Sequence, residues 1–172
     1  SEENLFEIEE IIIEDALIKT IQPEHKQMLK KVKKIQFNYS SALFWVSISD
    51  IVTVYELFVG CIQNKDTVFV SLNLDISSSW EINRSKIESF STLLNELSLV
   101  GHHFKNIPNV TFKGFKRLRT LFLSSNELTA LEKEAFVDLD NVEMLCLDKN
   151  KLSRLGQGIF SLMNKLKTLK LS

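Results

Sequence analysis

The sequence predicts a repeat solenoid, a fold in which copies of one short unit stack and each copy contributes a β-strand. The first observation is self-similarity: copies that begin at Leu94, Leu118 and Val142 follow one another at intervals of 24 residues, and a fourth begins at Leu166. The second is that apolar residues occupy places 1, 4, 6, 11, 14, 19 and 22 of these copies. One unit cannot bury its own apolar edge, whereas stacked units build a continuous core.

The order of residues within a copy predicts each part of the turn. Places 1 to 6 predict a short strand, because alternate side chains of a strand point to opposite faces. Asn126 and Asn150 at place 9 predict a turn in which a buried amide bonds to loop backbone. Place 19 predicts an aromatic spine along the back of the solenoid, formed by Phe112, Phe136 and Phe160.

The same frame recurs upstream with less regularity. Copies begin at Ile8, Val32 and Phe69, and the last of them runs 25 residues. The sequence therefore predicts a single domain over residues 1–172 with about seven repeats. We expect irregular repeats over residues 8–93 and regular repeats over residues 94–172.

Residues 45–68 have no register in this frame. The interval from Val32 to Phe69 is 37 residues, which does not divide into whole repeats. An extra strand formed by Val54, Leu57 and Val59 is an alternative, but it leaves only 15 residues before Phe69. That is too short for a normal repeat, so the register of this segment stays open.

The form LxxLxLxxNxLxxLxxxxFxxLxx, most regular over residues 94–172, resembles the 24-residue "typical" leucine-rich repeat. That repeat is found in the ectodomains of Toll and Toll-like receptors, in Slit-like guidance proteins and in secreted insect immune factors. The resemblance implies an α/β-type solenoid, shaped as a horseshoe with a parallel concave β-sheet and an irregular or 3₁₀ convex side. It also implies an extracellular setting, either secreted or in a receptor ectodomain.

The chain departs from that family pattern in two ways. It has no cysteine-rich caps, and its last copy stops inside a strand at Ser172, so we expect a fragment of a longer chain. The earlier copies lack asparagine at place 9, where the residues are Ala16, Ser40, Ser77 and His102. The N-terminal half should therefore be less regular, and His102 should be a buried imidazole bonded to loop backbone.

Composition and motifs exclude several classes of function. The net charge of −1 gives no general attraction to nucleic acid or to anionic membranes, and the lysine cluster at residues 30–34 is interpreted as a solvated face. No apolar run is long enough to insert into a membrane. The sequence has no phosphate loop, nucleophile elbow or zinc-binding HExxH motif, and its three histidines form no metal set. We predict no catalysis, no metal and no cofactor.

Two kinds of modification are considered. Three N-x-S/T sequons are candidates for glycosylation: Asn38, at the edge of the concave strand, and Asn83 and Asn109, on the convex side. Cys146 at place 5 is expected to point outward from the concave sheet. Cys61 is at least three strand positions away, about 14 Å, which exceeds the reach of a disulfide. A free thiol is expected at Cys146, with an intermolecular disulfide as the alternative.

Recognition is expected on the concave face, at places 2, 3, 5, 7 and 8 of the regular copies. Phe122, Met144 and Arg119 are the expected anchor, because these residue types are enriched at interfaces. The candidates for partner binding are Arg119, Phe122, Ser124, Glu143, Met144, Asp148, Lys149, Lys167 and Lys170. Upstream, the carboxylates Glu9, Glu10, Glu14 and Asp15 should lie beside Lys33 and Lys34 on the next strand, and pairing of these charges would hold the first two repeats in register.

These expectations support three hypotheses of function. The first is a non-enzymatic module that recognises protein partners outside the cell, and its link to innate immunity or cell-surface signalling rests on the family resemblance alone. The second is a structural or assembly scaffold, which would hold a partner chain or a further copy through its ends or through Cys146. The third is an intracellular scaffold.

Overall fold

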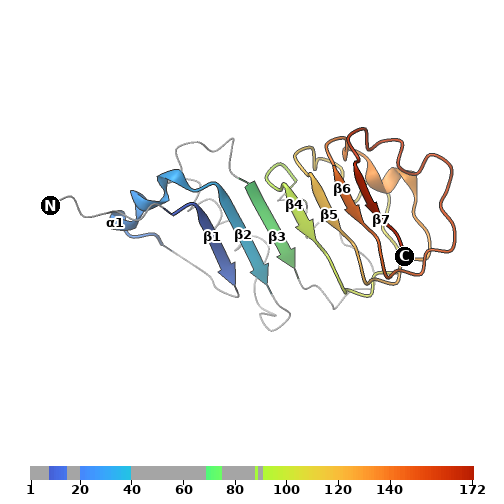
Figure 1. Cartoon of the computed structure of the whole chain (residues 1–172), viewed down its shortest axis with the longest axis horizontal. Coiled ribbons are helices and arrows are strands. Elements are labelled where there is room, and N and C mark those ends of the chain that lie inside the picture. The colour runs from blue at the N-terminus through green and yellow to red at the C-terminus, as the bar shows by residue number, and fades with distance from the viewer. Residues whose placement is uncertain (1–7, 15–19, 40–68, 75–87, 89–90) are drawn as a thin grey trace.

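The structure, a computed structural model, describes residues 8–14, 20–39, 69–74, 88 and 91–172. They form one seven-stranded parallel sheet whose strands follow one another in chain order from β1 to β7 (Figure 1). The strands are β1 (Glu10–Glu14), β2 (Lys34–Tyr39), β3 (Phe69–Leu74), β4 (Glu96–Ser98), β5 (Thr120–Phe122), β6 (Met144–Cys146) and β7 (Thr168–Lys170). Each pairs with its neighbours in sequence, as in a solenoid that adds one strand a turn, so the predicted fold class is confirmed.

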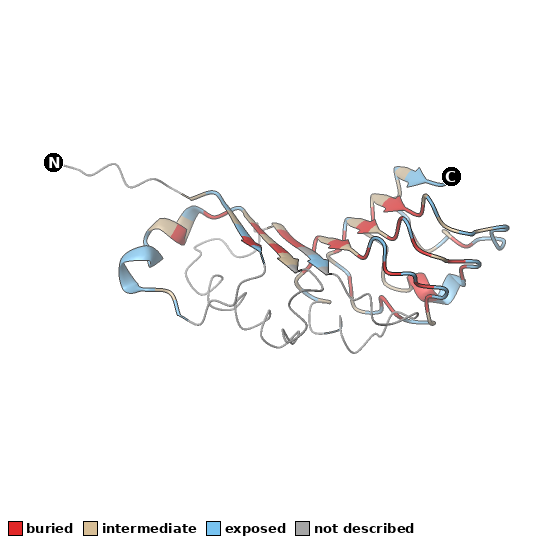
Figure 2. Ribbon diagram, turned by 90° about the horizontal axis from the view of Figure 1, so that it is seen from below, coloured by how far each residue is buried: buried red, intermediate tan, exposed pale blue. Residues whose placement is uncertain are grey.

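The sheet lines the concave side of the horseshoe, and the connecting segments lie on the other side (Figure 2). Where the structure describes them, these segments are mostly turns, and they include a one-turn α-helix, α1 (Pro23–Lys26), and the 3₁₀ helices η1 (Met28–Lys31) and η4 (Lys133–Phe136). α1 starts at a proline, whose missing N–H would have no partner in a first turn. The irregular and 3₁₀ convex side implied by the family resemblance is therefore present.

The apolar places of the regular repeats form the core between the sheet and the convex side. Leu121 and Leu145 are fully buried while Thr120 and Met144 beside them are partly exposed, which is the alternation expected of a strand with one buried face. On the convex side Phe112 and Phe136 are also fully buried. The rings of Phe136 and Phe160 lie 6.4 Å apart between centroids. The aromatic spine is thus continuous between these two repeats.

Asparagine at place 9 joins each regular repeat to the one before it. The Asn126 side-chain oxygen accepts hydrogen bonds from the backbone N–H groups of His102 (3.0 Å) and Phe104 (3.2 Å). Its amide nitrogen donates to the carbonyl oxygens of Leu99 and Leu123, both at 2.9 Å. A single buried side chain therefore satisfies loop backbone groups of two repeats, as predicted.

Asn150 repeats this arrangement one turn later. It accepts from the Leu128 N–H at 3.1 Å and donates to the carbonyl oxygens of Leu123 (2.9 Å) and Leu147 (2.8 Å). His102 holds the same place one repeat earlier and is buried as predicted, with an exposed fraction of 2%. We call the bonds of Asn126 and Asn150 the asparagine ladder.

The register between β2 and β3 differs from the prediction. The repeat frame aligned Val32 with Phe69, but the sheet pairs Lys34 with Phe69 and Ile35 with Val70. The shift is two residues, and because side chains alternate with a period of two, the same faces still point inward. Ile35 and Val70 are both buried.

The same pairing decides against one interpretation of the long interval between these strands. β2 is hydrogen-bonded directly to β3, so no additional strand lies between them in the sheet. Val54, Leu57 and Val59, which were considered for such a strand, lie outside the described residues, as does all of 45–68.

Candidate recognition face

The outward residues of the last three strands form a continuous surface, which we call the β5–β7 face. Parallel pairing places Thr120, Met144 and Thr168 in one row across the strands. Phe122, Cys146 and Lys170 form the next row. Residues 24 apart in sequence therefore become lateral neighbours, so a binding surface on this face is formed by residues from several repeats.

Phe122 and Met144 form the apolar centre of this face. Both are half-buried, and they lie diagonally on adjacent strands because Phe122 pairs with Cys146, two residues after Met144. Side chains related in this way are close enough to touch when they are long or aromatic. The structure thus brings together the two apolar residues of the predicted anchor.

Cys146 is buried, and the prediction that it is exposed was wrong. Only 2% of its surface is accessible, because a small side chain between the longer residues Phe122 and Lys170 is covered by them. Burial raises the pKa of the thiol, against the opposing effect of the Lys170 charge. A buried thiol of raised pKa is a poor nucleophile. This opposes the predicted alternative of an intermolecular disulfide at Cys146, while Cys61 lies outside the described residues.

The charged residues of the face differ in how they are held. Arg119, Lys149, Lys167 and Lys170 are exposed, whereas Glu143 and Asp148 are partly buried. The Lys167 Nζ lies 2.7 Å from a Glu143 carboxylate oxygen. That hydrogen bond lowers the pKa of Glu143, and the charge of Lys167 lowers it further. The charges of Arg119 and Lys165 make smaller contributions in the same direction.

Two further polar residues, predicted to be exposed, are buried. Ser124 is 9% exposed and donates its hydroxyl to an Asp148 oxygen at 2.7 Å. Asn95 is 7% exposed, and its side-chain oxygen accepts from the Val70 N–H at 3.0 Å. Asn95 thereby bonds β3 to the regular repeats. Both side chains hydrogen-bond to a neighbouring repeat, so they stabilise the stacking of the repeats more than they contribute to contact with a partner.

Two of the predicted ion pairs of the N-terminal strands are present, whereas Glu14 accepts a hydrogen bond from Asn38 and Asp15 lies outside the described residues. Lys33 pairs with Glu9, and the Lys34 Nζ lies 2.6 Å from a Glu10 carboxylate oxygen. The hydrogen bond from Lys33, followed by its charge, lowers the pKa of Glu9. These pairs join residues 24 apart in sequence and so hold β1 and β2 in register.

The sequons lie in different surroundings. Asn109 is exposed in a turn whose next residue, Val110, donates its N–H to the Glu134 oxygen of η4 on the convex side. Asn38 is half-buried on β2, and its amide nitrogen already donates to a Glu14 oxygen at 3.3 Å. Asn83 lies outside the described residues. Of the two that are described, Asn109 has the room for a glycan.

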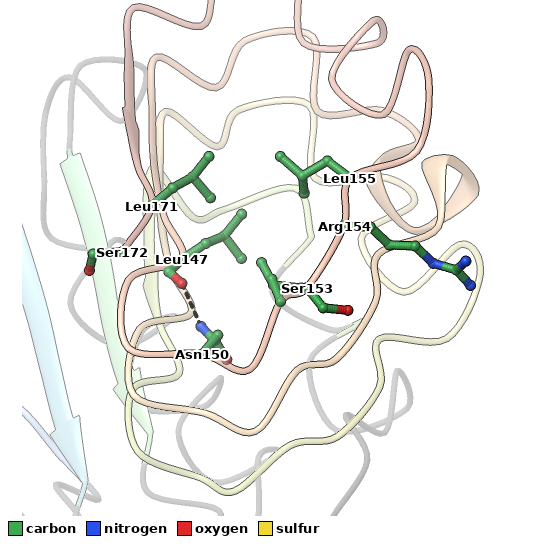
Figure 3. A pocket seen from close by; sticks show the side chains of 8 residues that line it. Leu147, Asn150, Ser153, Arg154, Leu155, Leu171 and Ser172 are labelled. Carbon is green, nitrogen blue, oxygen red and sulfur yellow. Dashed lines mark hydrogen bonds between the residues drawn. The ribbon is translucent and has the colours of Figure 1, made fainter.

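A cavity of about 490 Å³ lies at the end of the solenoid, shown in Figure 3. Its lining consists of Leu147, Asn150, Leu152, Ser153, Arg154, Leu155, Leu171 and Ser172. The leucines hold core places whose counterparts one repeat earlier are buried, so the cavity is a cross-section of the core. Arg154 directs its guanidinium away from the leucines (Figure 3). The lining includes the hydroxyls of Ser153 and Ser172 but no His, Cys, Asp, Glu or Lys side chain that could activate them.

The described part of the chain contains no cluster of three or more His, Cys, Asp or Glu residues arranged to hold a metal ion. Nor does it contain a helix that is both long and apolar enough to span a bilayer.

Comparison with known proteins agrees with this geometry. A family model described as "Leucine rich repeat" matches residues 92–152, which hold β4 to β6 and the asparagine ladder. The described fold is that of a leucine-rich-repeat solenoid. Over 94 residues the chain is 36% identical to Toll-like receptor 3 of Bos taurus and 35% identical to that of Boselaphus tragocamelus.

Each of these alignments covers 50% of this chain and 10% of the receptor, so this chain spans only a small part of such a protein. Among solved structures, TLR13 in its complex with ssRNA13 superposes with a TM-score of 0.68 at 14% identity, over 96% of this chain and 22% of that one. A leucine-rich-repeat protein of Leptospira interrogans superposes with a TM-score of 0.53 at 25% identity, over 98% and 37%. These superpositions show the shared solenoid fold.

Proposed function

We propose that this leucine-rich-repeat chain is a non-enzymatic recognition module that binds a protein partner on its β5–β7 face. The single observation that carries the proposal is the apolar centre of Phe122 and Met144, half-buried among polar residues such as Thr120, Thr168 and Lys170 on strands β5 to β7. An aromatic residue and a methionine that are already partly desolvated can be buried by a partner with little loss of side-chain freedom.

The proposed setting is extracellular, in a receptor ectodomain or a secreted protein of innate immunity or cell-surface signalling. The similarity to Toll-like receptor 3 supports it, as does the exposed Asn109 sequon. We propose that Asn109 carries a glycan and that Asn38 does not, since the Asn38 amide is engaged with Glu14. Mass spectrometry of the chain made in a secretory host would test this, and an unmodified Asn109 would contradict it.

A binding array tests the recognition face. The biotinylated chain is applied to an array of purified cell-surface and secreted proteins, beside a Phe122→Ser/Met144→Ser variant. We expect specific binders that lose at least about tenfold in affinity with the variant, because truncating a central apolar anchor costs more than about 1 kcal/mol per residue. Val110→Ser, an exposed apolar residue on the other side, is the matched control. Binders that the double variant retains at full affinity would exclude this face.

A role as an assembly scaffold is a weaker alternative. It would need an exposed thiol or an exposed apolar surface, and the burial of Cys146 opposes the exposed thiol. The RNA in the TLR13 complex is a property of that protein, and at 14% identity the likeness shows the fold alone. We therefore propose a protein partner for this chain.

A further inference from the structure

The charge on the concave sheet is unevenly distributed. On β1 and β2 the lysines Lys33 and Lys34 pair with Glu9 and Glu10, so the charges of these two lysines are balanced within the molecule. On the β5–β7 face four cations accompany two carboxylates. The C-terminal half of the face therefore carries an excess of positive charge that the protein itself does not balance.

Both carboxylates of the β5–β7 face are already occupied. Glu143 holds Lys167 at 2.7 Å, and Asp148 accepts the Ser124 hydroxyl at 2.7 Å. Among the residues that the structure describes, no carboxylate lies within ion-pair distance of Arg119, Lys149 or Lys170. These three cations remain available to a ligand.

The free cations surround the apolar centre. Lys170 lies in the row of Phe122 and Cys146, one strand beyond Cys146. Arg119 immediately precedes β5 and Lys149 follows β6, at the two ends of the strands that carry Phe122 and Met144. A ligand lying on Phe122 and Met144 would have a cation at each end and another beside it.

We propose that the β5–β7 face binds an acidic segment of the partner protein, with an apolar side chain seated on Phe122 and Met144. Carboxylates on either side of that apolar residue face Arg119, Lys149 and Lys170. This inference rests on the proposed recognition function and adds the chemistry of the partner. It differs from binding a polyanion such as RNA, because Glu143 and Asp148 among the cations would repel a continuous row of phosphates.

The test uses the full chain and three fluorescent probes. One is a short synthetic peptide with glutamates on both sides of a central phenylalanine, and the second is its twin with glutamine in place of every glutamate. The third is a single-stranded oligonucleotide of matching charge. Binding is measured by anisotropy at low and at physiological salt, with Lys149→Glu/Lys170→Glu as the test variant. Lys105→Glu/Lys133→Glu, two exposed lysines outside this face, has the same charge change and is the control.

We expect the acidic peptide to bind more tightly than its glutamine twin, and salt to weaken it. Its affinity should fall by about fivefold or more in the test variant and stay nearly unchanged in the control, since two exposed ion pairs are lost and two repulsions are added. Lys170→Gln, which removes one charge without reversing it, should give a smaller loss. Circular dichroism and thermal melting of all variants separate loss of binding from loss of folding.

Three results would overturn the inference. If the glutamine twin binds equally well and loses its affinity with Phe122→Ser, the face recognises proteins but not acidic ones. If the oligonucleotide binds as tightly as the acidic peptide, the face responds to charge alone. If the acidic peptide does not bind, or if its affinity is the same for the test variant, an acidic partner is excluded. The proposed recognition function then depends on the protein array alone.

Discussion

The two ends of the sheet are held in register by different interactions. Residues 94–172 repeat every 24 residues, and the buried amide of Asn126 and the partly buried amide of Asn150 bond to backbone groups of adjacent turns. β1 and β2 keep the same interval of 24 but are joined at the surface by exposed ion pairs. Buried hydrogen bonds act where water cannot compete, whereas exposed pairs are screened. The regular half should therefore be stable and the N-terminal half sensitive to solution conditions.

Removing a core leucine should give the largest effect and should distinguish the two halves. Leu145 is fully buried, whereas Ile12 on β1 is 53% exposed. We expect Leu145→Ala to lower the free energy of unfolding by about 3 kcal/mol through lost burial and a residual cavity. Ile12→Ala should cost less than about 0.5 kcal/mol. Urea denaturation monitored by circular dichroism measures both, and equal losses would contradict the contrast.

Breaking the asparagine ladder should have the next largest effect. Asn126→Ala leaves the His102 and Phe104 N–H groups and the Leu99 and Leu123 carbonyls without this partner. We expect a loss of about 2 to 3 kcal/mol, because several buried backbone groups lose their hydrogen bonds at once. Asn38→Ala on β2 is the matched change in the N-terminal half and should cost under about 1 kcal/mol. If Asn126→Ala unfolds in urea like the unmodified chain, the ladder does not stabilise the repeats.

A smaller gain is expected at place 8, where the backbone is left-handed in all three regular copies. Gly101, Ser125 and Lys149 hold this place with φ of 79°, 57° and 55°. Since only glycine adopts this region without steric cost, Ser125→Gly should raise the free energy of unfolding by up to about 1 kcal/mol. Ser153→Gly, an exposed serine that does not have positive φ, should instead be neutral or destabilising. Thermal melting compares the two, and equal effects would show that φ is not the cause.

Acid should produce the smallest effect, and it should act through the exposed pairs. Lys33 lowers the pKa of Glu9, Lys151 and then His103 lower that of Glu127, and Lys167 lowers that of Glu143. A carboxyl whose pKa is lower in the folded state stabilises the fold fully above its unfolded value of 4.5. This contribution is lost as the pH falls through the lower folded pKa.

As the pH falls below 4.5, the free energy of unfolding should decline more steeply for the unmodified chain than for the triple variant Glu9→Gln/Glu127→Gln/Glu143→Gln. Hydrogen exchange should show β1 and β2 opening first, because no asparagine ladder is described there. Identical pH profiles for the two proteins would mean that these pairs do not contribute.

The candidate site was predicted from sequence in part. Phe122 and Met144 were placed correctly, because strand alternation alone decides which side of the sheet they face. Ser124 and Cys146 were expected to be exposed by the same rule, and each is buried. Asn95 at place 2 was also expected to be exposed, but alternation places it on the inward side with Leu97 and Leu99, where it is buried. Strand alternation predicts which side of the sheet a side chain faces, but it does not predict whether other side chains bury it. For the small residues Ser124 and Cys146, the neighbours on adjacent strands decide the burial.

By itself the sequence determined the repeat, the inward face of each strand and the role of asparagine at place 9. These follow from local periodicity and from the hydrogen-bonding capacity of a single side chain. Only the tertiary structure decided that β2 pairs with β3 two residues away from the repeat frame, and which outward residues are covered. An even shift leaves every inward residue inward, so hydrophobic patterning could not detect it. The charge left unbalanced on the β5–β7 face likewise appears only when residues 24 apart lie side by side.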